Sequence, residues 1–250
     1  MRLGLLPLSV VMLGALAVTP PALAQFDANL VPGYTIWDIR FGEPISQIPA
    51  AEIAEIACGT NGGPPSTPLG SFAEFEKCPA EPSGLHEVYF TNDDEADYIA
   101  KALETEYRVM QGGNSIYAHP VVFSVLIDTG GIARGIRVVT DERASDRERR
   151  VAMTLSRNLK SRYGRWAQSC EELPPTDGQL PVGKIFVHEI CTADSPEGDA
   201  RMRLEATYFR KKGQTSINLE TQQVNKNYFQ SATRLEVVEK PYEPDTRPVR

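Results

Sequence analysis

The stretch between residues 121 and 164 constrains the fold most, because a strand pattern, a turn and a helix pattern follow one another there. Two apolar segments flank the polar turn at residues 128–131, which is typical of a β-hairpin. Pairing Ile127 with Ile132 brings nearly all the apolar side chains to one face of this hairpin. The same register pairs Val125 with Arg134, Phe123 with Ile136 and Val121 with Val138. An apolar face of this kind needs a covering layer.

A strongly basic amphipathic helix is predicted to follow the hairpin and to cover it. Ser145 and Glu148 have the spacing of a capping box, and Gly164 stands where a C-terminal glycine belongs. The apolar residues that recur at the helical step are Val151, Leu155, Leu159 and Tyr163. Hairpin and helix together predict a helix-on-sheet unit.

The remaining segments extend this unit to an α+β protein, in which covering helices pack on an antiparallel sheet. Further strands are expected near residues 34–41, 85–90, 184–190, 202–210, 216–219 and 234–238, and further helices near 48–57 and 95–110. The domains expected are a signal peptide at 1–24, a first α+β module at 25–118, a second at 119–240 and a disordered tail at 241–250. Two related modules and one continuous domain both fit this pattern, and a chance similarity of the halves is the alternative to a repeat.

The first 24 residues have the layout of a secretory signal peptide. Arg2 supplies a positive charge, an apolar run reaches residue 18, and small residues precede Gln25 at the expected cleavage site. A retained membrane helix fits less well, since prolines bracket a run too short to span a bilayer comfortably. We therefore expect a soluble exported chain that begins at Gln25 and is periplasmic in a Gram-negative host or secreted.

Four cysteines lie in the exported part, and an even number in an oxidising compartment predicts disulfides. We favour Cys58 with Cys78 and Cys170 with Cys191, because each pair brackets a loop rich in proline and glycine. Closing such a loop contributes about 3 kcal/mol in the chain-entropy model. A zinc site that uses His188 near Cys191 is the alternative, but the chain has no Cys-x-x-Cys or paired-histidine spacing. The sequence therefore predicts no metal site and no cofactor.

Charge is distributed unevenly along the chain. The 250 residues carry 26 Lys and Arg against 33 Asp and Glu, and this excess of acid argues against nucleic-acid binding. Eight basic residues nevertheless gather between residues 143 and 165. Those expected to face solvent and to anchor a partner are Arg147, Arg150, Arg157 and Lys160. They would bind an acidic envelope protein, an anionic polymer or an anionic lipid. The alternative is a solvent-exposed face whose positive charge balances acidic residues elsewhere on the fold.

Catalytic motifs are sparse. The triplet Asp128-Thr129-Gly130 resembles the active-site triplet of aspartic proteases, whose mechanism needs two carboxylates that share one proton. The chain has no second such triplet, so a protease would have to be a homodimer, and a hairpin turn explains the same residues equally well. The histidines are dispersed and form no metal-hydrolase or serine-hydrolase motif. The sequence therefore predicts a non-enzymatic binding protein, with a homodimeric hydrolase that uses Asp128 as the alternative.

A family resemblance points the same way. It rests on the turn at residues 128–131, on the return strand Ile136-Arg137-Val138-Val139, and on the segment at residues 159–164 that precedes a tryptophan. Together these resemble small exported modules of the beta-lactamase inhibitor protein kind and of small outer-membrane assembly lipoproteins. The resemblance implies a helix on an antiparallel sheet and a function in binding proteins, although this chain lacks the lipid-bearing cysteine of the lipoproteins.

Overall fold

The computed structural model describes residues 35–49, 53–92, 114–117, 119–143, 152–213, 216–217, 222, 224–225 and 230–247. These residues belong to one compact unit, Gly33–Arg250. The expected signal peptide, the expected capping box at Ser145 and Glu148, and the helix expected near residues 95–110 lie outside the described residues.

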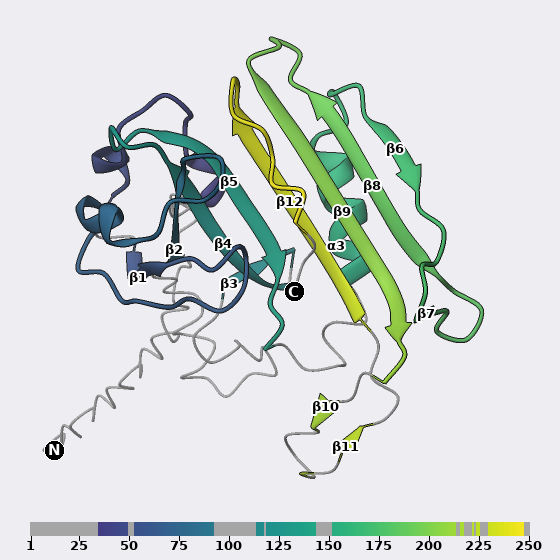
Figure 1. The fold of residues 1–250 in the computed structure, drawn as a ribbon. Helices are drawn as coiled ribbons and strands as arrows, with labels where there is room; N and C mark the ends of the chain where they lie inside the picture. The colour runs from purple at the N-terminus through teal and green to yellow at the C-terminus, as the bar shows by residue number, and fades with distance from the viewer. Residues whose placement is uncertain are drawn as a thin grey trace, which may run out of the picture. The chain divides into compact units, whose positions relative to one another are not determined.

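Ten of the strands within the described ranges form one antiparallel sheet, with the order β1-β2-β4-β5-β12-β9-β8-β6, β3 beside β4 and β7 beside β9 (Figure 1). The first half supplies β1 Ile53–Cys58, β2 His86–Asn92, β3 Asn114–Ile116, β4 His119–Ile127 and β5 Ala133–Thr140. The second half supplies β6 Ser169–Glu172, β7 Gln179–Leu180, β8 Val187–Asp194, β9 Ala200–Lys211 and β12 Gln230–Glu239. A separate pair consists of β10 Ser216–Ile217 and β11 Val224–Asn225. Strands from both halves of the chain therefore pair within one sheet.

The α+β fold class expected from the sequence is wrong, because the described residues form a mostly antiparallel β structure with a single α-helix. That helix is α3, Ala152–Arg162, and the other helical segments are the 3-10 turns η1 Ile36–Asp38, η2 Ile45–Gln47 and η4 Phe72–Lys77. The helix expected near residues 48–57 is in fact β1. A β-bulge between Ile53 and Glu55 interrupts the alternation of this strand, so Ile53 and Ile56 pack on the same core at a spacing that imitates a helix.

The hairpin of β4 and β5 exists, but its expected register is displaced by two residues. Val125 pairs with Ile136, and near the turn Ile127 pairs with Ala133 across a bulge. The turn is closed by the Asp128 N–H, which donates to the Ile132 carbonyl at 3.0 Å. Since a shift of two preserves the faces of a strand, the expected apolar side of the hairpin is retained.

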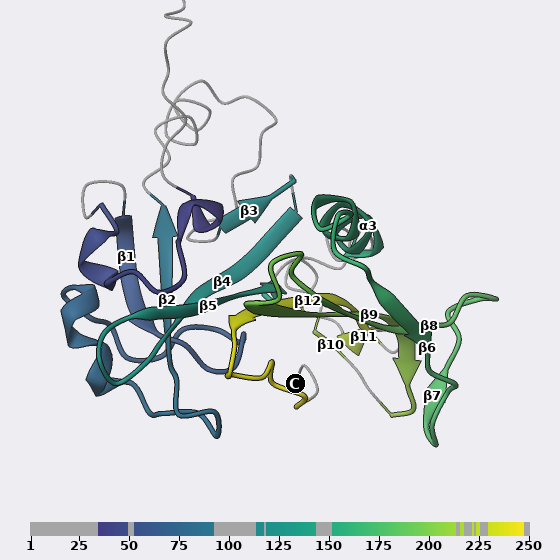
Figure 2. The ribbon, with the colours of Figure 1, turned by 90° about the horizontal axis from the view of Figure 1, so that it is seen from above.

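Helix α3 packs against β12 and β9, whereas the sequence placed it over the hairpin. Figure 2 shows α3 on one face of the sheet and the yellow C-terminal segment on the other. Leu155 and Leu159 are fully buried there, and the Thr233 hydroxyl of β12 donates to the Ala152 carbonyl at the start of the helix. The apolar side of the hairpin joins a core with other residues, namely Ile36, Ile39, Ile45, Ile48, Phe72 and Phe75. Segments distant in sequence therefore supply the cover that the local pattern assigned to the helix.

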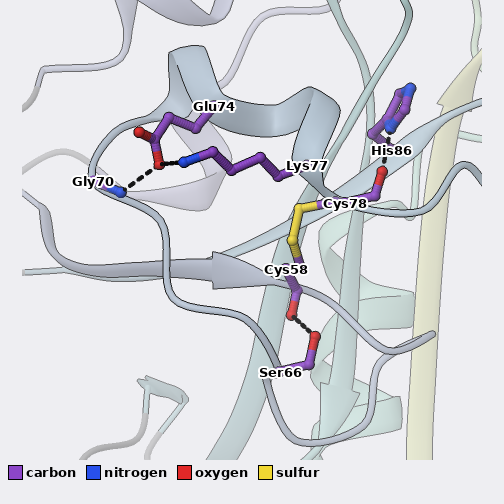
Figure 3. The surroundings of a disulfide bond; sticks show 7 residues. All are labelled: Cys58, Ser66, Gly70, Glu74, Lys77, Cys78 and His86. Atoms are coloured by element: carbon purple, nitrogen blue, oxygen red, sulfur yellow. Dashed lines mark hydrogen bonds and ion pairs between the residues drawn. A yellow bond between two sulfur atoms is a disulfide. The ribbon is translucent and has the colours of Figure 1, made fainter.

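Both expected disulfides are present. Cys58 at the end of β1 is bonded to Cys78 at the end of η4, and His86 donates to the Cys78 carbonyl from 2.7 Å (Figure 3). Cys170 and Cys191 lie directly opposite each other on β6 and β8 and form the second bond. The first disulfide fixes η4 to the sheet, and the second fixes the edge strand β6.

The sheet face opposite α3 carries buried charges that we call the charge layer, defined by Arg137, Arg234, Glu81, Glu87 and Glu236. The Arg137 side chain is completely buried and lies 2.8 Å from carboxylate oxygens of all three glutamates. Burial alone would lower the pKa of Arg137, but the three carboxylates raise it well above its ordinary value, so the guanidinium stays charged. Arg234 donates to Glu236 at 2.9 Å. Each buried charge in the layer therefore has an opposite charge beside it, as burial requires.

The charge layer also holds two irregular segments against the sheet. Glu87 accepts hydrogen bonds from the backbone N–H groups of Asn61 and Gly62 in the first disulfide loop. Gly62 lies so close to β5 that an added Cβ would stand 2.3 Å from the Val139 side chain. Residues 241–247, where the sequence led us to expect a disordered tail, return along this face, and the Asp245 N–H donates to Glu236 at 2.9 Å.

Replacing Arg137 with methionine should lower the free energy of unfolding by about 3–5 kcal/mol, because three carboxylates would lose their shared buried cation. Replacing the exposed Arg157 with methionine removes the same charge from the surface and should cost less than about 0.5 kcal/mol. Urea unfolding followed by circular dichroism measures both variants. A loss below about 1 kcal/mol for Arg137→Met would show that the charge layer does not hold the fold.

Candidate ligand-binding cleft

A cleft of about 550 Å³ opens on the face of the sheet that carries α3. Its sides are η1 with the residues that follow it, the C-terminal end of α3, and the turn between β8 and β9. Apolar residues from the segment before β1 and from the central strands β5 and β12 line its base, namely Ile36, Ile39, Ile136 and Val237. This combination of concave shape and apolar base is typical of ligand sites.

Four aromatic side chains stand around the cleft, two on the η1 side and two on the α3 side. Trp37 and Phe41 come from η1 and the residues after it, whereas Tyr163 and Trp166 follow the last turn of α3. The rings of Tyr163 and Trp166 meet edge to face, with centroids 5.0 Å apart. All four side chains are only partly buried, so they offer apolar surface to a ligand.

Local hydrogen bonds set the positions of the aromatic residues. Thr35 and Asp38 form a capping box around η1, in which the Trp37 N–H donates to the Thr35 hydroxyl at 3.3 Å. At the other side, the Gln168 side chain donates to the carbonyls of Lys160 and Tyr163, each at 2.8 Å. These bonds satisfy backbone groups that a helix end leaves open, so both sides of the cleft are held by their own backbone.

One cation lies across the cleft. The Arg162 guanidinium stands 4.1 Å from the centroid of the Trp37 ring, which is cation–π geometry. Arg162 is exposed although it contacts this ring. Burial raises the pKa of Tyr163 to about 12, and Arg162 opposes part of this shift. Tyr163 is therefore a neutral phenol at physiological pH.

Carboxylates from β12 and from the β8–β9 turn also line the cleft. Glu239 is bound to Arg134 at 2.5 Å, so its charge is compensated. Asp199 accepts a hydrogen bond of 2.6 Å from the neutral Ser195 hydroxyl, and Glu197 is exposed on the same turn. The residues that line the cleft thus include one arginine and three carboxylates, of which two belong to the β8–β9 turn.

Asp128, the residue of the hydrolase alternative, stabilises the hairpin turn. It accepts hydrogen bonds from the N–H groups of Gly130 and Ile132 and from Arg134 at 2.7 Å. Burial alone would raise the pKa of Asp128, but these hydrogen bonds together lower it below its ordinary value. A carboxylate held ionised by an arginine differs from the proton-sharing pair that aspartic-protease chemistry needs.

The basic residues singled out in the sequence do not gather in one described site. Arg147 and Arg150 lie outside the described residues, and Arg157 is exposed on α3. Lys160 forms an ion pair of 2.7 Å with Glu189 and so links α3 to β8. Sequence reasoning missed Arg162 as a site residue, and the scarcity of tryptophan is the one signal that points to the cleft, because Trp37 and Trp166 are the only two in the chain.

A cluster of metal-ligand side chains occurs at Cys170, Glu189 and Cys191. The two sulfurs are joined in a disulfide, so neither can act as the thiolate that zinc binds. His188, considered with Cys191 for zinc, lies 3.0 Å from Glu205 through its Nε2 atom. The donor set at this position therefore does not fit a zinc site.

Comparisons with protein-family models, with curated proteins and with solved structures find no match to this chain. Within the part of the chain that the structure describes, no helix is both long and apolar enough to cross a membrane.

Replacing Asp128 with asparagine should lower the free energy of unfolding at pH 7 by about 1–2 kcal/mol, since charge-assisted hydrogen bonds to the turn and to Arg134 are lost. The folded-state pKa of Asp128 is depressed, so its contribution is present above its ordinary value of 3.8 and is lost as the pH falls through the folded value. Urea unfolding at pH 7 and at lower pH should show that the difference in the free energy of unfolding between wild type and Asp128→Asn becomes smaller as the pH falls.

The matched control for this measurement is Asp177→Asn, which changes an exposed aspartate in another turn and should leave stability unchanged at both pH values. An equal loss for Asp128→Asn at every pH would contradict an ionised, turn-stabilising Asp128.

Proposed function

We propose that this chain is an exported, non-enzymatic binding protein and that its ligand site is the aromatic cleft. The observation that carries the proposal is the set of four partly exposed aromatic side chains around a cleft of about 550 Å³ with an apolar base. Aromatic residues supply large contact areas at a small cost in side-chain entropy. A soluble protein that leaves such surface open usually uses it for contact with a partner.

Export is supported by the two disulfides and by the expected signal peptide. Disulfides persist in the periplasm and outside the cell, whereas cytosolic thiols are kept reduced. Both bonds in this chain hold structural elements, one at η4 and one at the edge strand β6. We propose a periplasmic location in a Gram-negative host, or secretion in another host.

Binding is favoured over catalysis by the protonation states of the groups at the cleft. A general acid or base works best with a pKa near the working pH. The pKa of Tyr163 is raised to about 12, and the Arg162 guanidinium contacts the Trp37 ring. Tyr163 and Arg162 therefore give the cleft contact surface and fixed charge, which are the properties of a binding site. Asp128 does not line the cleft, and it is ion-paired with Arg134 at the hairpin turn.

Tryptophan fluorescence tests the proposal, because both tryptophans of the chain line the cleft. A panel of acetylated hexapeptide amides with apolar, basic and acidic sequences should contain at least one class that shifts the emission saturably. Calorimetric titration should then show at least a tenfold loss of affinity for Trp166→Ala, as expected for an aromatic anchor.

Two outcomes would contradict the cleft as the ligand site. One is a panel in which no class alters the emission of the folded wild type. The other is binding that survives unchanged in the Trp37→Ala, Trp166→Ala double variant. Phe186→Ala is the matched control, since Phe186 stacks on Phe209 and does not line the cleft, and it should bind as wild type does.

A further inference from the structure

We propose that the ligand of the cleft is a basic peptide segment, whose arginine side chain replaces Arg162 on the face of Trp37. The inference rests on the proposed function and names the chemistry of its ligand. Two independent observations support it: an arginine of this chain already occupies the Trp37 ring, and two carboxylates of the β8–β9 turn line the same cleft without an ion pair to any described residue.

The first observation is the contact between Arg162 and Trp37. The ring accepts a guanidinium at 4.1 Å, so the geometry for an arginine from another molecule already exists. Arg162 is the last residue of α3 and is exposed, and besides the Trp37 ring its side chain contacts the Tyr163 hydroxyl, so an incoming arginine has to replace these two contacts. The contact is therefore one that an incoming arginine can take over without any change in the backbone.

The second observation is the charge around the ring. Of the three carboxylates at the cleft, Glu239 is compensated by Arg134, whereas Asp199 is hydrogen-bonded to a neutral hydroxyl and Glu197 is exposed. The β8–β9 turn thus presents two negative charges to a cleft that holds one arginine. Complementary charge favours a cationic partner and disfavours an acidic one.

The apolar base of the cleft favours a peptide over a small cation as the ligand. Ile36, Ile39, Ile136 and Val237 line the base, and a small hydrophilic cation would leave this surface without a partner. A segment in which arginine stands next to leucine or another apolar residue fills the base and reaches the ring together. The class of ligand is accordingly an arginine flanked by apolar residues.

In this arrangement Arg162 competes with the ligand for the Trp37 ring. The direction in which the affinity changes when Arg162 is removed therefore tests the proposal. An exposed cation–π contact is worth about two- to fivefold in an equilibrium constant, which the ligand must overcome before it binds. Removing Arg162 therefore tightens a basic ligand, because the ring is vacant and a like charge is gone. Removing it would weaken an acidic ligand, since Arg162 would be the receptor for the anion.

The probe is the peptide acetyl-Leu-Arg-Leu-amide, compared with the same peptide in which neutral citrulline replaces arginine. Calorimetry and tryptophan emission should show the arginine peptide binding at least tenfold more tightly to wild type. Arg162→Met should tighten the arginine peptide by about three- to tenfold, and Glu197→Gln should weaken it with a reduced dependence on salt. Arg165→Met is the matched control, because Arg165 is exposed nearby but does not line the cleft, and it should change nothing.

Each other outcome overturns the inference. Weaker binding by Arg162→Met, together with a preference for an acidic peptide, would make Arg162 an anion receptor. Equal binding of the arginine and citrulline peptides would leave the cleft as an apolar site, so the proposed function would stand and the inference would fail. If no peptide of any class alters the emission of wild type or of Arg162→Met, with thermal unfolding unchanged, both proposals fail together.

Discussion

The buried ion pairs of Arg137 are the contacts on which the rest of the described fold depends. On one face of the sheet, Arg137 of β5 binds Glu236 of β12. On the other face, the neighbouring residues of the same two strands, Ile136 and Val237, form part of the base of the cleft. Because successive side chains of a strand point to opposite faces, the bond that fixes one layer also fixes the other. This favours a cleft that is already formed before a ligand arrives, which lowers the cost of binding.

The parts of the fold that sequence could predict are those set by neighbouring residues. The hairpin and both disulfides follow from turn chemistry and from cysteine spacing, and both are present. The register near the turn could not be predicted, because the bulge beside Arg134 places that side chain between Asp128 and Glu239, and Glu239 is distant in sequence. A second bulge, in β1, gives Ile53 and Ile56 a spacing of three residues on one face, and this spacing led to the wrong prediction of a helix. Bulges depend on tertiary partners, so a local pattern does not reveal them.

The charge layer and the candidate site were both largely hidden from the sequence for a related reason. Arg137 occurs in an alternating strand pattern that places it on a solvent face, yet that face is covered by the first disulfide loop and by residues 241–247. Trp37 and Trp166 are far apart in the sequence, and nothing in the local pattern connects them. In the fold, η1 and the end of α3 line the same cleft, so both tryptophans do too. The sequence shows the basic residues of α3 but not their partners. It therefore could not distinguish Lys160, which is ion-paired with Glu189, from Arg162, which lies on the Trp37 ring. In each case the contact that sets the role of the residue is made with a residue distant in sequence, which a local pattern does not reveal.

A crystal structure of the protein with acetyl-Leu-Arg-Leu-amide would show whether an arginine of the ligand takes the place of Arg162 on Trp37. We expect the guanidinium of the peptide to lie on Trp37, Arg162 to be turned into solvent, and the backbones of β5 and β12 to move by less than about 1 Å, as in other preorganised complexes. A peptide bound away from the cleft, or an Arg162 that still covers Trp37 in the complex, would contradict a preformed site for arginine.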